Sequence, residues 1–192
     1  GLIASSIMSK KLASGAHSIV LDVKVGEGAF MKDIDSATKL AEALVKIGKK
    51  CGRKVSAILT DMSKPLGNMV GNSLEVIEAI ETLKGRGPKE FEYLCKRVCV
   101  ELLMMTNFVN SEDEALNLIN EKIESGEALE KLRELIKYQH GDPNVIDDYS
   151  LLPLASKKIE VLSEEEGYVK KIDALGIGLS AMLLGAGRES KN

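Results

Sequence analysis

Aromatic residues, histidine, cysteine and proline are all scarce in this sequence of 192 residues. It contains no tryptophan, four prolines, two histidines and three cysteines, and 4% of its residues are aromatic. The cysteines (Cys51, Cys95 and Cys99) lack the spacing of a metal site, and their odd number argues against a disulfide framework. A reducing compartment suits them best. The histidines, His17 and His140, lie far apart, and no serine or cysteine pattern near them indicates a catalytic triad.

Long apolar runs and an excess of one charge are also missing. No apolar stretch approaches the roughly 18 residues that a membrane-spanning helix needs, and the opening residues do not have the pattern of a signal peptide. The formal net charge is -3, from 26 basic and 29 acidic residues, which gives no reason to expect a nucleic-acid partner. We therefore expect a cytoplasmic protein that binds neither nucleic acid nor membranes.

The residues that are present predict an α/β fold. Residues 19–25 form an apolar, β-branched run that is typical of a strand covered on both faces. An amphipathic helix over 34–50 and a second strand over 54–60 follow, and such a β-α-β unit has a right-handed crossover and parallel strands. Loops at 26–31 and 61–68 follow the two strands, and ligands of α/β proteins bind at such carboxyl ends.

Helical patterns account for most of the remaining chain. They cover residues 2–14, 74–83, 90–105, a stretch that begins after Ser111, and 127–138. The residue pattern then changes from helical to alternating: residues 159–162 and 167–172 look like two short strands around an acidic turn. Residues 177–184 follow as a helix rich in small residues.

The loop Gly26-Glu27-Gly28 does not match a dinucleotide-binding fingerprint. Met31 stands where the third glycine would be, and no ribose-binding acid follows at the expected distance. The simpler interpretation is a turn that needs positive φ at one or both glycines. Lys24 and Lys32 flank the loop and could either attract an anion or be solvated. The pattern thus predicts a small-ligand cleft at two strand-end loops and does not identify the ligand.

Two pairs of polar residues share helix faces. Ser6 and Lys10 lie four apart, so one face presents a hydroxyl and a cation. Glu75 and Glu78 lie three apart on the helix after the second loop, where one of them could turn back toward the loop carbonyls and hold a hard cation. Spacing alone favours a solvated helix face for both pairs.

Several separate motifs resemble the pyrimidine nucleoside phosphorylases, in the same order and spacing as in that family. They are Ser5–Lys11, Asp22–Met31, Thr60–Gly67, Gly71–Val76 and Leu184–Arg188. The resemblance covers essentially the whole chain. The form Pro65-Leu66-Gly67 looks more like the broad-specificity enzyme, which takes both uridine and thymidine.

The resemblance implies a parallel-sheet domain of the nucleoside phosphorylase or phosphoribosyltransferase type, with flanking helices. Residues 1–15 would end a helical domain, residues 16–156 would form the α/β domain, and residues 157–192 would begin a C-terminal α+β module. Family members are more than twice as long, and the chain opens abruptly without a start methionine. We therefore expect it to be a piece of a longer protein, whose remainder would hold the phosphate loop and most of the dimerising helical domain.

Carried over residue by residue, the resemblance also implies a base-binding site. Ser6 and Lys10 match the base-binding serine and lysine of the family, and Lys10 would be the catalytic residue. A lysine near a ring oxygen stabilises the negative charge that develops on the departing base. Ile7 and Phe30 match positions that line the base pocket.

A monovalent-cation site, usually for potassium, is implied in the same way. Leu66 and Met69 match residues that donate backbone oxygens, and Glu78 matches a glutamate that donates its side chain. Relatives often have alanine where this chain has Met69, but a backbone ligand tolerates that change. The other ligands would belong to the part of the protein outside this sequence.

The reaction that the resemblance implies is phosphorolysis of uridine, thymidine or deoxyuridine to the free base and (deoxy)ribose 1-phosphate, in nucleoside salvage. Phosphate would be the co-substrate, no organic cofactor would be needed, and the full-length parent would be a homodimer. We expect the 192-residue chain alone to be inactive. The alternatives are thymidine phosphorylase, a non-catalytic binding or assembly module of the same fold, and an enzyme similar to anthranilate phosphoribosyltransferase, which the motif at Asp22–Phe30 fits poorly.

Overall fold

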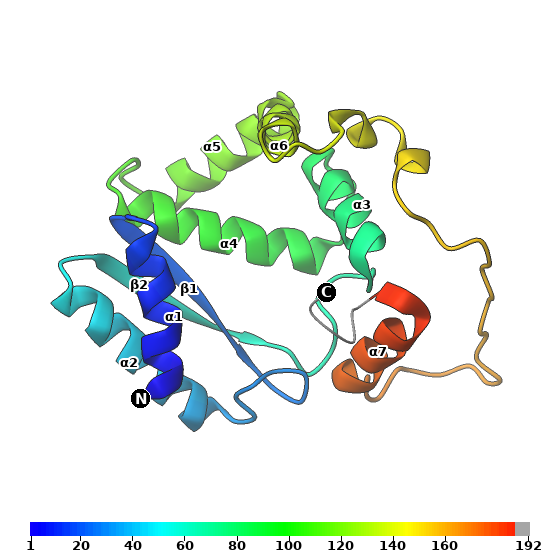
Figure 1. Cartoon of the computed structure of the whole chain (residues 1–192), viewed down its shortest axis with the longest axis horizontal. Coiled ribbons are helices and arrows are strands. Elements are labelled where there is room, and N and C mark those ends of the chain that lie inside the picture. Colours follow the sequence, from blue (N-terminus) through cyan, green and yellow to red (C-terminus); the bar gives the residue numbers. More distant parts are fainter. Residues whose placement is uncertain (187–192) are drawn as a thin grey trace.

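A computed structural model describes residues 1–186 of the chain (Figure 1). Gly187 and Arg188, which end the last motif, lie outside the described residues, as does the end of the expected C-terminal module. The elements follow in the order α1 (Leu2–Ala13), β1 (Ser18–Val25), α2 (Ile34–Lys50), β2 (Lys54–Asp61), α3 (Asn72–Leu83), α4 (Lys89–Met105), α5 (Glu112–Glu124), α6 (Glu127–Tyr138) and α7 (Ala174–Ala181). Short 3-10 turns cover Pro143–Ile146 and Tyr149–Leu151, and a wider helical turn covers Met182–Ala186.

The predicted β-α-β unit is confirmed. Strands β1 and β2 pair in parallel, with Ser18 opposite Lys54 and Val25 opposite Asp61. Helix α2 connects them and is capped by Asp33, whose side chain accepts a hydrogen bond of 2.8 Å from the backbone N–H of Ser36. This cap satisfies an N–H group that would otherwise lack a partner at the helix start.

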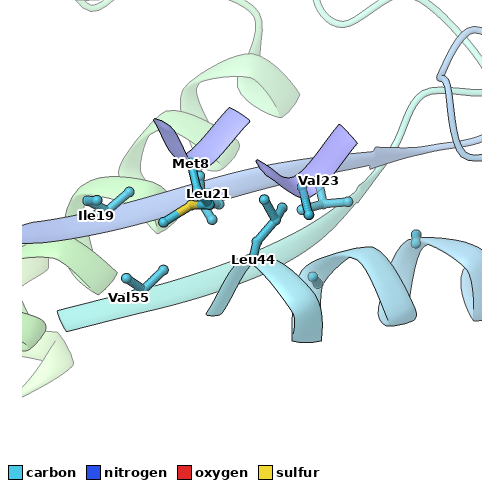
Figure 2. Close-up of a cluster of buried hydrophobic side chains, with 9 residues drawn as sticks. Met8, Ile19, Leu21, Val23, Leu44 and Val55 are labelled. Atoms are coloured by element: carbon cyan, nitrogen blue, oxygen red, sulfur yellow. The ribbon is translucent and has the colours of Figure 1, made fainter. Parts of the chain in front are cut away.

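The main core lies between one face of the sheet and helices α1 and α2. Alternate residues of β1 point into it and meet side chains from both helices and from β2, so the apolar positions of four elements fill one volume (Figure 2). The labelled core residues are Met8, Ile19, Leu21, Val23, Leu44 and Val55. On β1, Asp22 and Lys24 alternate with these residues and belong to the opposite face of the sheet, toward which α4 packs.

The two strand-end loops lie side by side, as the sequence predicts. The backbone N–H of Met62 donates to the carbonyl of Val25, at 2.6 Å, and the N–H of Gly28 donates to the carbonyl of Met62, at 3.0 Å. Gly26 has a φ of +128°, which only glycine adopts readily. Gly28 has no such angle, but a Cβ there would lie 2.8 Å from the carbonyl oxygen of Met62. The two glycines are therefore needed for different reasons.

Helices α3 to α6 form the second part of the chain. Val100, Val109 and Ala115 make a small core where α4 contacts α5. None of the helices within residues 1–186 combines the length and apolar character that crossing a membrane requires.

The two strands expected at residues 159–162 and 167–172 are not formed, so that prediction is wrong. The structure gives residues 157–173 no regular secondary structure, and Val161 and Tyr168 are almost fully exposed. An alternating pattern is a local property, whereas a strand needs a hydrogen-bonding partner. The described residues bring no strand beside this segment. The following helix begins at Ala174, three residues earlier than expected, because Asp173 caps it by accepting from the N–H of Gly176.

Ion pairs and hydrogen bonds attach the connection after α6 to helices α3 and α6. Arg133 of α6 binds Asp147, with 2.9 Å between Nη1 and Oδ2. Glu81 of α3 accepts two hydrogen bonds from Arg86, at 2.7 and 2.8 Å, and a third from the hydroxyl of Tyr149. The hydrogen bond with Arg86, followed by the one with Tyr149, lowers the pKa of Glu81 to about 2.

The lowered pKa of Glu81 predicts an acid-sensitive contribution to stability. Because the folded pKa lies below the ordinary 4.5, the contribution is present above that pH and is lost as the pH falls toward 2. We expect Glu81→Gln to lower the free energy of unfolding by about 1–2 kcal/mol at pH 6, after allowance for solvent screening. The difference should shrink between pH 4.5 and 2 in urea unfolding. Glu124→Gln, at an exposed glutamate, is the control, and a pH-independent difference for Glu81→Gln would contradict the prediction.

Candidate functional site

Helix α1 carries two of the expected site residues on its solvent side. Ala4 and Met8 are buried against the core, whereas Ser6 and Lys10 are exposed. Within residues 1–186, neither the Ser6 hydroxyl nor the Lys10 ammonium has a hydrogen-bonding or ionic partner. Their backbone carbonyls do accept hydrogen bonds, that of Ser6 from the hydroxyl of Ser9 and that of Lys10 from the N–H of Ser14. The helix therefore presents a hydroxyl and a cation to solvent with their bonding capacity free.

Ile7 and Phe30 are brought together, although 23 positions separate them in the sequence. Both line a hollow of about 170 Å³, whose other walls are residues 21–24 of β1 and the side chains of Met31, Leu40 and Leu44. Phe30 is 77% exposed, so most of its ring has no packing partner in the described chain. An exposed ring beside an apolar hollow is suited to cover the face of a flat ligand. Ser6 and Lys10 stand on the same helix but do not line this hollow.

Phe30 is placed by the backbone of its loop rather than by packing. The N–H of Gly26 donates to the carbonyl of Met31, and the N–H of Ala29 donates to the carbonyl of Gly26, both at 3.0 Å. Lys32 reaches back to the carbonyl of Glu27, with 2.7 Å between nitrogen and oxygen. These bonds close residues 26–31 into a tight turn, which we call the glycine loop.

The lysines that could have made this loop an anion cradle are already engaged. Lys24 forms an ion pair of 2.7 Å with Asp22, and Lys32 donates to a backbone carbonyl. A second hollow, of about 500 Å³, lies beyond the loop and is lined by Gly26, Glu27, Lys32, Asp61, Ser63, Lys64 and residues 169–172. Lys64 in its wall pairs with Glu90. Lys24 and Lys32 are therefore not simply solvated, because each is bonded to a group in the strand or in the loop that follows it.

One polar cluster was missed by the sequence interpretation. Thr60 of β2 donates to the Asp22 carboxylate, which also binds Lys24. The register that sets Lys24 opposite Thr60 brings these side chains together. The signal in the sequence was the pair of charged residues at alternate positions of an otherwise apolar strand. Thr60 could be added only once the pairing was known.

Glu78 does turn back to the loop after β2, but it meets amides instead of carbonyls. Its Oε2 accepts from the N–H groups of Asn68 and Met69, at 2.7 and 3.2 Å, and the residue is only 7% exposed. Glu75 likewise accepts from the N–H of Gly71, at 3.0 Å. A carboxylate is an acceptor, so backbone N–H groups are its natural partners. The structure therefore brings Glu78 beside the loop that contains Leu66 and Met69.

The donor set suits a cation only if backbone oxygens supply most of the ligands. No group of three or more His, Cys, Asp or Glu side chains in residues 1–186 could hold a metal ion. The buried Glu78 carboxylate is one hard oxygen donor beside a loop whose carbonyls are further oxygen donors. This chemistry is compatible with an alkali cation and unsuited to a transition metal.

Residues 2–129 match the family model described as "Glycosyl transferase family, a/b domain". The chain belongs to this family. The matched span of the a/b domain includes α1, both strands and their loops, and therefore contains every site residue expected from the sequence. The predicted α/β fold class is confirmed.

The relatives of this a/b domain have consistent names. The pyrimidine-nucleoside phosphorylase of Geobacillus stearothermophilus is 50% identical over 190 residues, which are 99% of this chain and 44% of that protein. The proteins of the same name from Bacillus subtilis and Staphylococcus haemolyticus are 49% and 48% identical over the same shares. The chain thus spans less than half the length of these relatives. The resemblance to pyrimidine nucleoside phosphorylases is confirmed.

The contact between Gly67 and Glu78 allows a direct test of the loop after β2. Gly67 has a φ of +75°, and a Cβ there would lie 2.1 Å from Oε1 of Glu78. In Gly67→Ala the carboxylate must move, which leaves the amides of Asn68 and Met69 without their acceptor. We expect a loss of about 3 kcal/mol in the free energy of unfolding, measured by urea denaturation.

Gly85→Ala is the matched control for this change. Gly85 has the same φ of +75° but no atom within 4 Å of the Cβ position. It should cost about 1 kcal/mol, which is the backbone strain alone. Equal losses in the two variants would show that the Glu78 contact contributes nothing.

Proposed function

We propose that the full-length protein to which this chain belongs catalyses the phosphorolysis of pyrimidine nucleosides. Uridine, thymidine and deoxyuridine would yield the free base and (deoxy)ribose 1-phosphate. The observation that carries the proposal is the meeting of Ile7 and Phe30 at one hollow, beside a helix whose Lys10 ammonium has no partner within residues 1–186. The names of the relatives support the same reaction.

The site residues divide the work between the faces and the edge of the base. Ile7 and the exposed ring of Phe30 cover the faces of the pyrimidine and keep water from it. Ser6 and Lys10 lie one turn apart on α1 and bind its polar edge. This division requires the nucleoside to extend past the hollow toward the solvent side of α1.

Lys10 acts when the glycosidic bond breaks. The bonding electrons leave with the base, C1′ becomes cationic in character, and a phosphate oxygen forms the new bond to C1′. A fixed ammonium near the ring oxygen stabilises the negative charge on the base more in the transition state than in the bound nucleoside. Phosphate is the co-substrate, and no organic cofactor is required.

The rest of the protein supplies what this chain does not show. We propose that the phosphate-binding groups belong to that part, so the 192-residue chain has no activity by itself. The full-length protein would work as a homodimer in the cytoplasm. We also propose that potassium binds between Glu78 and the backbone oxygens of Leu66 and Met69, where it would steady the loop after β2.

Substitution of Lys10 tests the assigned chemistry. In the full-length protein, we expect Lys10→Ala to lower kcat for uridine by about 100- to 1000-fold, because one preorganised group that stabilises transition-state charge is lost. The fold should be intact, because Lys10 is exposed and makes no contact that holds α1 in place. Release of free base from uridine and phosphate, followed by chromatography, is the measurement.

Lys11→Ala is the control for this experiment. Lys11 is the next residue, equally exposed, and faces another direction because adjacent helix positions do not share a face. Its kcat should stay close to that of the unmodified protein. Near-normal turnover by Lys10→Ala would remove Lys10 from its assigned role.

The potassium proposal predicts a selective effect of a charge-removing change. Glu78→Gln should raise the KCl concentration for half-maximal activity by about tenfold or more, which corresponds to the loss of about 1.4 kcal/mol of binding free energy. Glu75→Gln, on the same helix and also bonded to a backbone amide, is the matched control and should not change it. The proposal is wrong if full activity is reached in choline chloride without potassium.

A further inference from the structure

The glycine loop, residues 26–31, is contacted from outside by a distant part of the chain. Lys171 and Glu27 form an ion pair with 2.9 Å between Nζ and Oε1, although 144 positions separate them. Ala174 lies close on the same side, because a Cβ added to Gly28 would come within 2.9 Å of the Ala174 Cβ. In Figure 1 the segment that leads into α7 accordingly returns to the loop that follows β1.

This contact acts on the loop that presents Phe30. The N–H groups of Gly26 and Ala29 hold the loop together from within, and the N–H of Gly28 attaches it to the carbonyl of Met62. Phe30 is 77% exposed and has little packing of its own, so its position follows that of the loop. Glu27 is fixed through its carbonyl by Lys32 and through its side chain by Lys171. The side-chain contact is the one that depends on residues beyond 157.

We propose that Lys171 is a positioning residue for nucleoside binding: through its ion pair with Glu27 it holds the glycine loop so that Phe30 faces the base. The assignment rests on the proposed function. Lys171 does not line the hollow formed by Ile7 and Phe30, so its role in binding runs through the loop. The segment after residue 157 thereby contributes to substrate affinity without contacting substrate.

Charge and exposure set the size of the expected effect. The two side chains are 66% and 55% exposed, and such surface pairs contribute little to global stability. Their effect falls instead on a local equilibrium between the ordered loop and less ordered forms. A loop that is ordered less of the time lowers the apparent affinity by the same fraction, with the chemical step unchanged.

Steady-state kinetics of the full-length protein tests this role. We expect Lys171→Met to raise KM for uridine by about two- to fivefold, while kcat and KM for phosphate stay near their original values. Glu27→Gln should give the same rise, and the double variant should add nothing further, because both changes remove one contact. The charge-exchanged variant, Glu27→Lys with Lys171→Glu, should restore most of the affinity.

Lys170→Met is the matched control. Lys170 is the neighbouring exposed lysine and lines the same 500 Å³ hollow, but it makes no ion pair within residues 1–186. Its KM for uridine should be unchanged. An equal rise in Lys170→Met would indicate a general effect of positive charge and overturn the proposal, as would an unchanged KM in Lys171→Met.

Hydrogen exchange separates this inference from the proposed function. The amides of Gly26, Gly28 and Ala29 report on loop order in the absence of substrate. Their exchange should be about two- to fivefold faster in Lys171→Met and unchanged in Lys170→Met. Identical exchange in the wild type and Lys171→Met would show that the ion pair does not order the loop, whatever the activity. Faster exchange in a protein without phosphorolysis would retain the loop contact and overturn its assignment to nucleoside binding, together with the proposed function.

Discussion

The parallel pairing of β1 with β2 is the constraint on which the rest of the structure depends. Because Val25 stands opposite Asp61, both loops leave the sheet at the same level and exchange backbone hydrogen bonds at once. The pairing is held in register by the apolar face that α1 and α2 cover, since a slip by one residue would turn Leu21 and Val23 away from the core. The same α1 that seals this face carries Ser6 and Lys10 on its solvent side and Ile7 at the edge of the core. Core and site are therefore positioned by one helix.

The side chains around the strand ends fall into two groups, those with a bonding partner in the described residues and those without one. Most strand-end charges have a partner: Lys24 binds Asp22, Lys32 and Lys171 hold Glu27, and Glu78 accepts two amides. These groups stiffen loops. The Lys10 ammonium and the Phe30 ring, in contrast, have almost no partner in the described residues. An unpaired cation and an exposed aromatic ring add nothing to the stability of the fold. The proposed site consists of what the fold leaves unpaired, and the surrounding pairs fix its shape.

Local patterns predicted the elements well and their long-range partners poorly. The bounds of α2 and α6 and the two parallel strands follow from periodicity, caps and glycines, all of which act within a few residues. Residues 159–172 show the opposite case, because their alternation satisfies the local rule while no strand in residues 1–186 pairs with them. Glu78 was expected to face carbonyls and instead accepts amides, since loop geometry decides which backbone groups point inward. The approach of Ile7 to Phe30 came from family resemblance alone, because no spacing rule links a helix to a loop beyond the next strand.

The small size of the sheet affects how this domain behaves in solution. Among the described residues it contains only β1 and β2, so each strand has one edge whose N–H and C=O groups are not paired within the sheet. Edges of this kind are templates for pairing with other chains. The apolar, β-branched sequence of β1 lacks the prolines and most of the charges with which edge strands are usually protected. Separated from whatever covers those edges, the domain would be prone to self-association, and its solubility would become a sensitive reporter of whether its natural neighbours are in place.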